Sequence, residues 1–184
     1  RDTPLVQALD ASFAEQLGAV EQPVSRPTGD SLARYGANLL PVDHRPTGLA
    51  SPVFSYPYSR TREALETLRR NGDPDPWHGH KMRFVNPVTG GYAMPTIGTF
   101  MQLLPAGFDG KPHRCTDATV FTPVEGEGRT QVGDQTIEWS ARDVFVVPSW
   151  SQVRHHASVD AVLFSFSDRP VQQATGLFRE ERSP

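Results

Sequence analysis

The sequence predicts an all-β fold, a closed or double-sheet barrel preceded by helical and extended segments. Short apolar alternations run from Met82 to Phe166 and are separated by Gly, Pro and Asp turns, a pattern typical of strands that bury one face. The 17 prolines and 15 glycines are spread along the chain in short clusters, which suits many turns better than long helices. Gly133-Asp134 lies between two alternating runs and is a strong hairpin signal.

Two different segments are predicted at the start of the chain. In residues 4–14, Leu5, Leu9 and Phe13 fall at helical spacing and predict one short amphipathic helix. Residues 19–58 are interrupted throughout by proline, glycine and aspartate. We interpret this part as an extended arm that lies on another surface, where its backbone groups find partners.

One further helix is predicted over residues 60–70, with Ser59 as its N-cap and Gly72 just past its end. The pattern changes to strands shortly afterwards. We therefore divide the chain into residues 1–81, with the two helices and the arm, and residues 82–184, the barrel with a C-terminal tail.

Nine strands are predicted within the barrel, which is the number expected of a closed or double-sheet architecture. Their ranges, read from the alternation and the intervening turns, are 82–85, 96–104, 112–115, 118–122, 127–132, 135–139, 143–147, 152–157 and 160–166.

Composition excludes several classes of function. The net charge is −3, from 18 basic and 21 acidic residues, so there is no basic surplus for nucleic acid. No apolar stretch is long enough to span a membrane. A single cysteine, Cys115, excludes an internal disulfide and favours a reducing cytoplasm. The sequence begins at Arg1 rather than methionine, so we expect a further segment upstream.

Two segments resemble the two-motif signature of the cupins, a family of jelly-roll barrels. They are GFDGKPHRCTDATVFTPVEGEG (107–128) and RDVFVVPSWSQVRHHA (142–157). Gly107 and His113 fit the opening of the first motif and Gly126 its close, while Pro148 fits the turn of the second. The resemblance implies a double-stranded β-helix.

Most metal ligands of that signature are replaced in this chain. Residues two apart on a strand share a face, so His113 and Cys115 occupy the geometry of the cupin His-x-His pair. The glutamate position falls on Thr119 or Val120, and the third histidine position falls on Val153. We therefore predict that this barrel holds no catalytic metal.

His155 leaves an alternative open, because it lies two residues beyond Val153 and shares its face. That displacement is about 6.6 Å along a strand, so a β-bulge is needed to bring His155 to a metal. His113, Cys115 and His155 would then form a mixed N/S set more typical of zinc than of oxygen-activating iron.

The other histidines are interpreted as structural. His78 and His80 lie in the loop DPDPWHGHK, where we expect a solvated pair, and His156 should point away from His155. His44, in the arm, is interpreted as a packing or hydrogen-bonding residue.

Longer strings are similar to the gentisate 1,2-dioxygenase family in particular, and together they cover most of the chain. They are RPTGDSLARYGANLLPVDHRP, SPVFSYPYSRTREALETL, MRFVNPVTGGYAMPTIGTFMQLLPAGF, DVFVVPSW and AVLFSFSDRPVQQATGLFREER. Salicylate and 1-hydroxy-2-naphthoate dioxygenases share the architecture, so they stay open as alternatives.

The resemblance implies a bicupin with two barrels in one chain, commonly a homotetramer, with Fe(II) held by three histidines in the amino-terminal barrel. The present sequence would be the inter-barrel segment and the carboxy-terminal barrel. The family's partners are an aromatic acid and O2, and gentisate is opened to maleylpyruvate.

Two hypotheses follow. In one, this half braces the catalytic barrel and contributes to subunit contacts. In the other, the chain is a metal-free structural or small-molecule-binding module.

Overall fold

The computed structural model describes residues 30–40, 42–43, 49–53 and 55–183. The chain divides into two compact units, Arg1–Asp30 and Ser31–Pro184, and the account below concerns the second. The helix predicted over 4–14 and the role predicted for His44 lie outside the described residues. The division into 1–81 and 82–184 stays a prediction.

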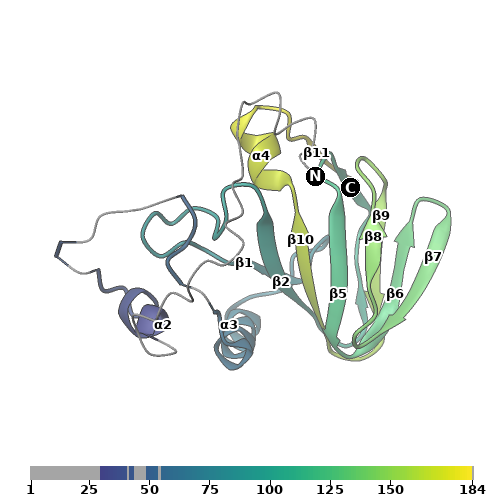
Figure 1. Cartoon of the computed structure of the whole chain (residues 1–184). Coiled ribbons are helices and arrows are strands. Elements are labelled where there is room, and N and C mark those ends of the chain that lie inside the picture. Colours follow the sequence, from purple (N-terminus) through teal and green to yellow (C-terminus); the bar gives the residue numbers. More distant parts are fainter. Residues whose placement is uncertain (1–29, 41, 44–48, 54, 184) are drawn as a thin grey trace, which may run out of the picture. The chain divides into compact units, whose positions relative to one another are not determined.

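Two antiparallel sheets face each other and enclose the core (Figure 1). The five-stranded sheet has the order β1 (His80–Arg83), β2 (Gly98–Leu104), β10 (Ala161–Ser167), β5 (Thr119–Glu125) and β8 (Phe145–Val147). The other sheet has the order β11 (Glu180–Arg182), β4 (His113–Cys115), β9 (Val153–Ala157), β6 (Glu127–Val132) and β7 (Gln135–Ser140), with β3 (Phe108–Asp109) paired to β9. This confirms the all-β cupin jelly roll.

The alternation of each strand selects which side chains enter the barrel. On β10, Leu163 faces inward and packs with Phe121, Phe145 and Trp139 in the core between the sheets. Phe121 and Phe145 stack with ring centroids 5.2 Å apart. Burial of such side chains contributes about 1.5–3 kcal/mol each to folding, so this aromatic layer holds the two sheets together.

The outer face of β2 is covered by a helix, α3 (Tyr58–Asn71). Leu65 of α3 is fully buried against Met101 and Leu103 of β2. Because β2 is covered on both faces, all of its residues except Thr99 are buried, including the polar Gln102. The helix begins after Pro57 without a side-chain cap, so the predicted Ser59 N-cap is wrong, whereas Gly72 does lie just past its end.

Four short elements were not predicted: α2 (Asp30–Tyr35), β3, α4 (Arg169–Ala174) and β11. Helix α2 interrupts the predicted arm. In β11 all three residues are exposed, so no apolar alternation marks it. The described part of the arm binds the chain's own loop, because the amide of Ser51 donates to the carbonyl of Ala93 at 2.7 Å.

Two glycines fix turns that the motifs anticipated. Gly133 has φ 56° in the hairpin that joins Val132 to Gln135, as predicted. Gly126 has φ 76°, and a Cβ there would collide with the carbonyl oxygen of Asp160. The glycine that closes the first cupin motif is therefore required by both conformation and space.

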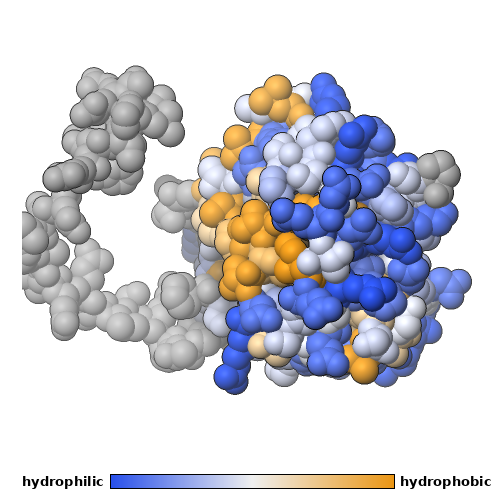
Figure 2. Space-filling model, turned by 90° about the vertical axis from the view of Figure 1, so that its right-hand side faces the viewer, coloured by the Kyte–Doolittle hydropathy of each residue, from blue (hydrophilic) through white to orange (hydrophobic). Residues whose placement is uncertain are grey.

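The outer face of the five-stranded sheet keeps an apolar area beyond α3. Val146 of β8 pairs with Val120 of β5, and Val120 pairs with Phe166 of β10. Val144 and Val146 are 65% and 51% exposed. Figure 2, which faces the right-hand side of the molecule as drawn in Figure 1, shows hydrophobic residues gathered in one patch with hydrophilic residues around it. Among the described helices, none has the length and apolar content to cross a bilayer.

Candidate functional site in the barrel interior

His113 opens β4 with its side chain inside the barrel, 5% exposed. It pairs directly with Val153 of β9, so the position aligned with the third cupin histidine is its cross-strand neighbour. Burial first, then the charges of His78 and Lys81, lower the pKa of His113 to about 3. The imidazole is neutral at physiological pH.

His78 is part of the same interior, so its prediction as a solvated loop residue is wrong. The carboxylate of Asp75 accepts hydrogen bonds from the amides of Trp77 and His78, both at 2.9 Å, and this folds the loop inward. The His78 ring meets the His113 ring edge to face at 4.4 Å between centroids. His80 is buried as well, at 4% exposure.

His155 is fully buried on β9 and is engaged by its neighbours. The indole of Trp139 donates to the hydroxyl oxygen of Thr130 at 2.8 Å, and the same oxygen lies 2.8 Å from Nδ1 of His155. Because the Thr130 oxygen can accept a second hydrogen bond or donate its own proton, either neutral tautomer of His155 satisfies this contact. Burial holds the pKa of His155 well below its usual value.

His156 has the opposite orientation to His155, as predicted. It is half-buried on the outer side, and its Nδ1 lies 3.5 Å from the carboxylate of Asp109. Val153, His155 and Ala157 are the buried residues of β9, which confirms that His155 shares a face with Val153.

Cys115 lies beside an ion pair. Arg169, at the start of α4, donates to the carboxylate of Asp117 at 3.0 and 3.2 Å and approaches Sγ of Cys115 at 3.6 Å. Burial raises the pKa of the Cys115 thiol to about 11, against the opposing charge of Arg169. The group is a thiol at neutral pH, and thiolate is the form that binds metals.

Lys81 brings a positive charge into the interior, and sequence reasoning missed it. Its ammonium lies 5.0 Å from the ring centre of Phe100 and 5.9 Å from that of Phe121. Burial, followed by the charge of Arg169, lowers its pKa to about 8. Its inward position follows from the register, because Lys81 pairs with Gln102 and Met82 with Met101, which packs under α3. The usable signal was therefore the period of two along residues 80–83.

Strand β11 closes this side of the barrel and contributes a carboxylate. Its residue Glu180 pairs with Cys115 across the ladder, and its side chain reaches Nε2 of His78 at 3.4 Å. The contact with His78, followed by that with Arg182, lowers the pKa of Glu180 to about 2.

These groups do not fit a metal centre. Within the described residues, no group of three or more His, Cys, Asp or Glu side chains is arranged to hold a metal ion. Nδ1 of His155 already contacts Thr130, Cys115 is protonated, and Lys81 adds a positive charge nearby. A site on His113, Cys115 and His155 stays a prediction that requires these side chains to rearrange.

Three buried polar atoms here lack hydrogen-bond partners: Oε1 of Gln102, Nδ1 of His113 and Oγ of Ser165. Buried groups of this kind normally bind ordered water. Gln102 pairs directly with Lys81 and with Leu163 across the five-stranded sheet. The arrangement is a polar core with neutral imidazoles, charges of both signs and aromatic walls.

Comparison with known proteins gives the family. A gentisate 1,2 dioxygenase of Aquipseudomonas alcaligenes is 56% identical over 99% of this chain, and a gentisate 1,2-dioxygenase of a Streptomyces species is 38% identical over 98%. The salicylate 1,2-dioxygenase structure from Pseudaminobacter salicylatoxidans superposes with a TM-score of 0.84 at 28% identity, over 97% of this chain and 53% of that one. No family model matches the sequence.

The chain spans about half the length of the curated relatives it matches, 52% of each of the two named above. Fold, motif spacing and identity along nearly the whole sequence agree. The chain therefore belongs to the gentisate 1,2-dioxygenase family and corresponds to the carboxy-terminal cupin half of its bicupin members.

Proposed function

We propose that this chain is part of an enzyme that uses Fe(II) and O2 to cleave the ring of a hydroxylated aromatic acid, with gentisate converted to maleylpyruvate. The observation that carries the proposal is the 56% identity to a gentisate 1,2 dioxygenase along 99% of the chain. In this conversion both atoms of O2 enter the product, and the ring bond between the carboxylate-bearing carbon and the adjacent hydroxyl-bearing carbon breaks.

Within that enzyme, we assign this barrel a structural role. The side chains that could act as metal ligands already contact other protein groups. His155 contacts Thr130 and Phe121, and Cys115 contacts Arg169. Because these groups do not fit Fe(II), we expect the iron mainly in the amino-terminal barrel. We also expect a homo-oligomer in a reducing cytoplasm, which suits the free thiol of Cys115.

One alternative concerns the identity of the substrate. A 1-hydroxy-2-naphthoate dioxygenase of a Nocardioides species is 32% identical over 98% of this chain, and the matched solved structures include salicylate 1,2-dioxygenase. The shared class is an aromatic acid with a hydroxyl beside its carboxylate.

Oxygen uptake distinguishes a catalytic role of this half from a structural one. The 184-residue chain, supplied with Fe(II) and gentisate, is expected to consume O2 at the background rate. The same chain joined to the amino-terminal half should produce maleylpyruvate, and His113→Phe in that longer protein should leave kcat within about two-fold if folding is retained. Stoichiometric iron and turnover by the 184-residue chain alone would contradict the structural role.

A further inference from the structure

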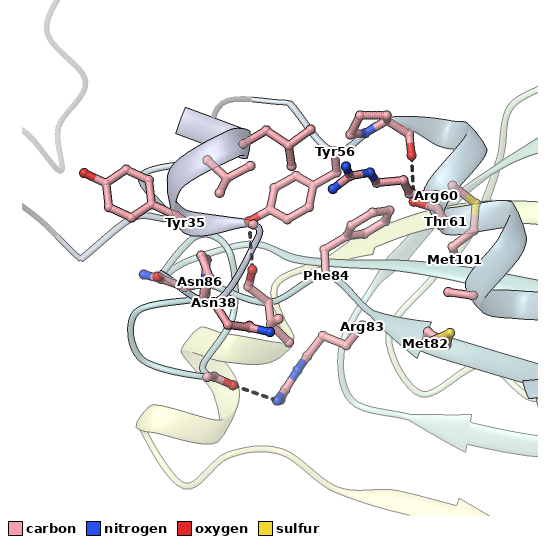
Figure 3. A pocket seen from close by; sticks show the side chains of 18 residues that line it. Tyr35, Asn38, Tyr56, Arg60, Thr61, Met82, Arg83, Phe84, Asn86 and Met101 are labelled. Atoms are coloured by element: carbon pink, nitrogen blue, oxygen red, sulfur yellow. Dashed lines mark hydrogen bonds between the residues drawn. The ribbon is translucent and has the colours of Figure 1, made fainter. Parts of the chain in front are cut away.

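A cavity lies outside the barrel, between α2, α3 and the strand β1. Its volume is about 480 Å³, within the range of about 300–1,000 Å³ typical of small-molecule sites. Figure 3 shows side chains from these elements converging on it. This cavity shares no lining residue with the barrel interior described above.

The walls of the cavity are apolar, aromatic and partly uncovered. Tyr56 and Phe84 meet edge to face with centroids 5.3 Å apart, and Met82 and Met101 complete the wall near α3. Met82 and Val85 are 38% and 40% exposed. A flat apolar body placed here would cover them, and methionine side chains adapt readily to aromatic rings.

Most polar side chains of the wall already have partners. The hydroxyl of Tyr56 donates to the carbonyl of Val85 at 2.8 Å, Asn86 accepts from the amide of Val88 at 3.0 Å, and Arg83 donates to the carbonyl of Gly90 at 3.3 Å. These groups shape the cavity and leave little capacity for a strongly polar ligand.

Arg60 differs from the other polar groups of the wall. Its side chain lines the cavity from α3 and reaches toward Tyr56 (Figure 3). Among the described residues it makes neither a hydrogen bond nor an ion pair, and no described lining residue is acidic. An unpaired guanidinium beside an apolar wall is complementary to a carboxylate on an apolar body.

We propose that this cavity is a binding site for a small apolar carboxylate, held by Arg60 at its anionic end and by Tyr56, Phe84, Met82 and Met101 along its apolar body. The proposal does not depend on the ring-cleavage activity. It concerns binding at a place remote from the barrel interior, so its failure would leave the proposed function intact.

The test uses the three methionines of the chain as reporters. In the full chain with ¹³C-methyl methionine, 1-naphthoate is expected to shift the signals of Met82 and Met101 and to leave that of Met94, which does not line the cavity. Octanoate tests whether an aliphatic body serves as well as an aromatic one. The neutral isostere 1-naphthalenemethanol should bind about ten-fold more weakly than 1-naphthoate, as expected from the loss of a charge-assisted bond.

Two variants test the assignment of groups. Arg60→Gln should raise the Kd of 1-naphthoate about ten-fold, while Arg70→Gln, at an exposed position of the same helix that does not line the cavity, should not change it. Ala64→Phe, which fills the cavity without truncating a buried side chain, should abolish the methionine shifts at an unchanged Tm. Equal affinity for the acid and the alcohol, an unaffected Arg60→Gln, or no shift at Met82 and Met101 would overturn the proposal.

Discussion

Single residues decide whether the barrel can close, and the motif glycine Gly126 is the clearest case. With φ 76° and the carbonyl of Asp160 at the place of a Cβ, it cannot accept a side chain without movement of the backbone. Gly126→Ala should destabilise the fold by more than about 2 kcal/mol, since the conformation alone costs about 1–2 kcal/mol. Urea unfolding measures this.

Gly90→Ala is the matched control for Gly126, because Gly90 has a similar φ of 71° with open space around it. It should show the conformational cost alone. Equal losses in the two variants would mean that the contact with Asp160 is not limiting.

The buried imidazole of His113 predicts sensitivity to acid. Its pKa in the fold, about 3, lies below its unfolded value of about 6.5, so the unfolded chain takes up the proton first. Stability should fall as the pH drops below about 6.5, by about 2 kcal/mol at pH 5 from this residue. His113→Phe should therefore lose about 2 kcal/mol less than the natural chain between pH 7 and pH 5.

His156→Phe is the comparison for that experiment, since its side chain lies on the outer side at 31% exposure. If the stability of the natural chain and that of His113→Phe depend on pH in the same way, His113 is not a buried neutral group in solution.

At the scale of elements, the strands and α3 were predictable because their alternation or spacing reports one buried face. The two-residue hairpin at Gly133 was predictable from turn chemistry alone. Strand β11 was not, because all its residues are exposed at an edge and its pairing with β4 depends on contacts across the chain. The interior position of His78 was missed for a related reason: the Asp75 carboxylate that folds its loop leaves no periodic signal.

Strand β11 gives a prediction through its two neighbouring glutamates. Glu180 contacts His78 and has a pKa of about 2, below the unfolded value near 4.5, so its stabilising effect is present above about pH 4.5 and is lost as the pH falls toward 2. With partial exposure taken into account, Glu180→Gln should cost about 1–2 kcal/mol at pH 7. Thermal denaturation at pH 7 measures the loss.

Glu181→Gln should change stability by less than about 0.5 kcal/mol, because Glu181 makes a surface ion pair with Arg114 at 2.7 Å. A larger loss in Glu181→Gln than in Glu180→Gln would contradict a stabilising contact of Glu180 with His78.

At the scale of the whole molecule, the apolar patch of Val120, Val144, Val146 and Phe166 predicts association of the 184-residue chain with a second copy. Exposed apolar sheet faces of this kind associate in water, and β8, which ends the five-stranded sheet within the described part of the chain, adds backbone groups at its outer edge. Val146→Lys should shift sedimentation toward the monomer. Val159→Lys, at an exposed turn between β9 and β10, is the control and should not.

The family was predictable at this scale from continuous sequence strings. The set of charged groups that surrounds His113 in space was not. Lys81 and Glu180 come from opposite ends of the barrel sequence, and only the closed fold brings their charges near His113 and His78.

The contacts between the loop at Trp77 and the C-terminal segment 180–183 affect the order of folding. The indole of Trp77 donates to the carbonyl of Ser183 across 106 residues, and His78 meets Glu180 across 102. Contacts of such sequence separation form after local hairpins, since a long loop must first be closed. The β6–β7 hairpin can form early. The barrel stays open at its His78 side until the contacts with residues 180–183 form. The slowest kinetic phase of refolding should therefore be reported by Trp77 rather than by Trp139 in the core.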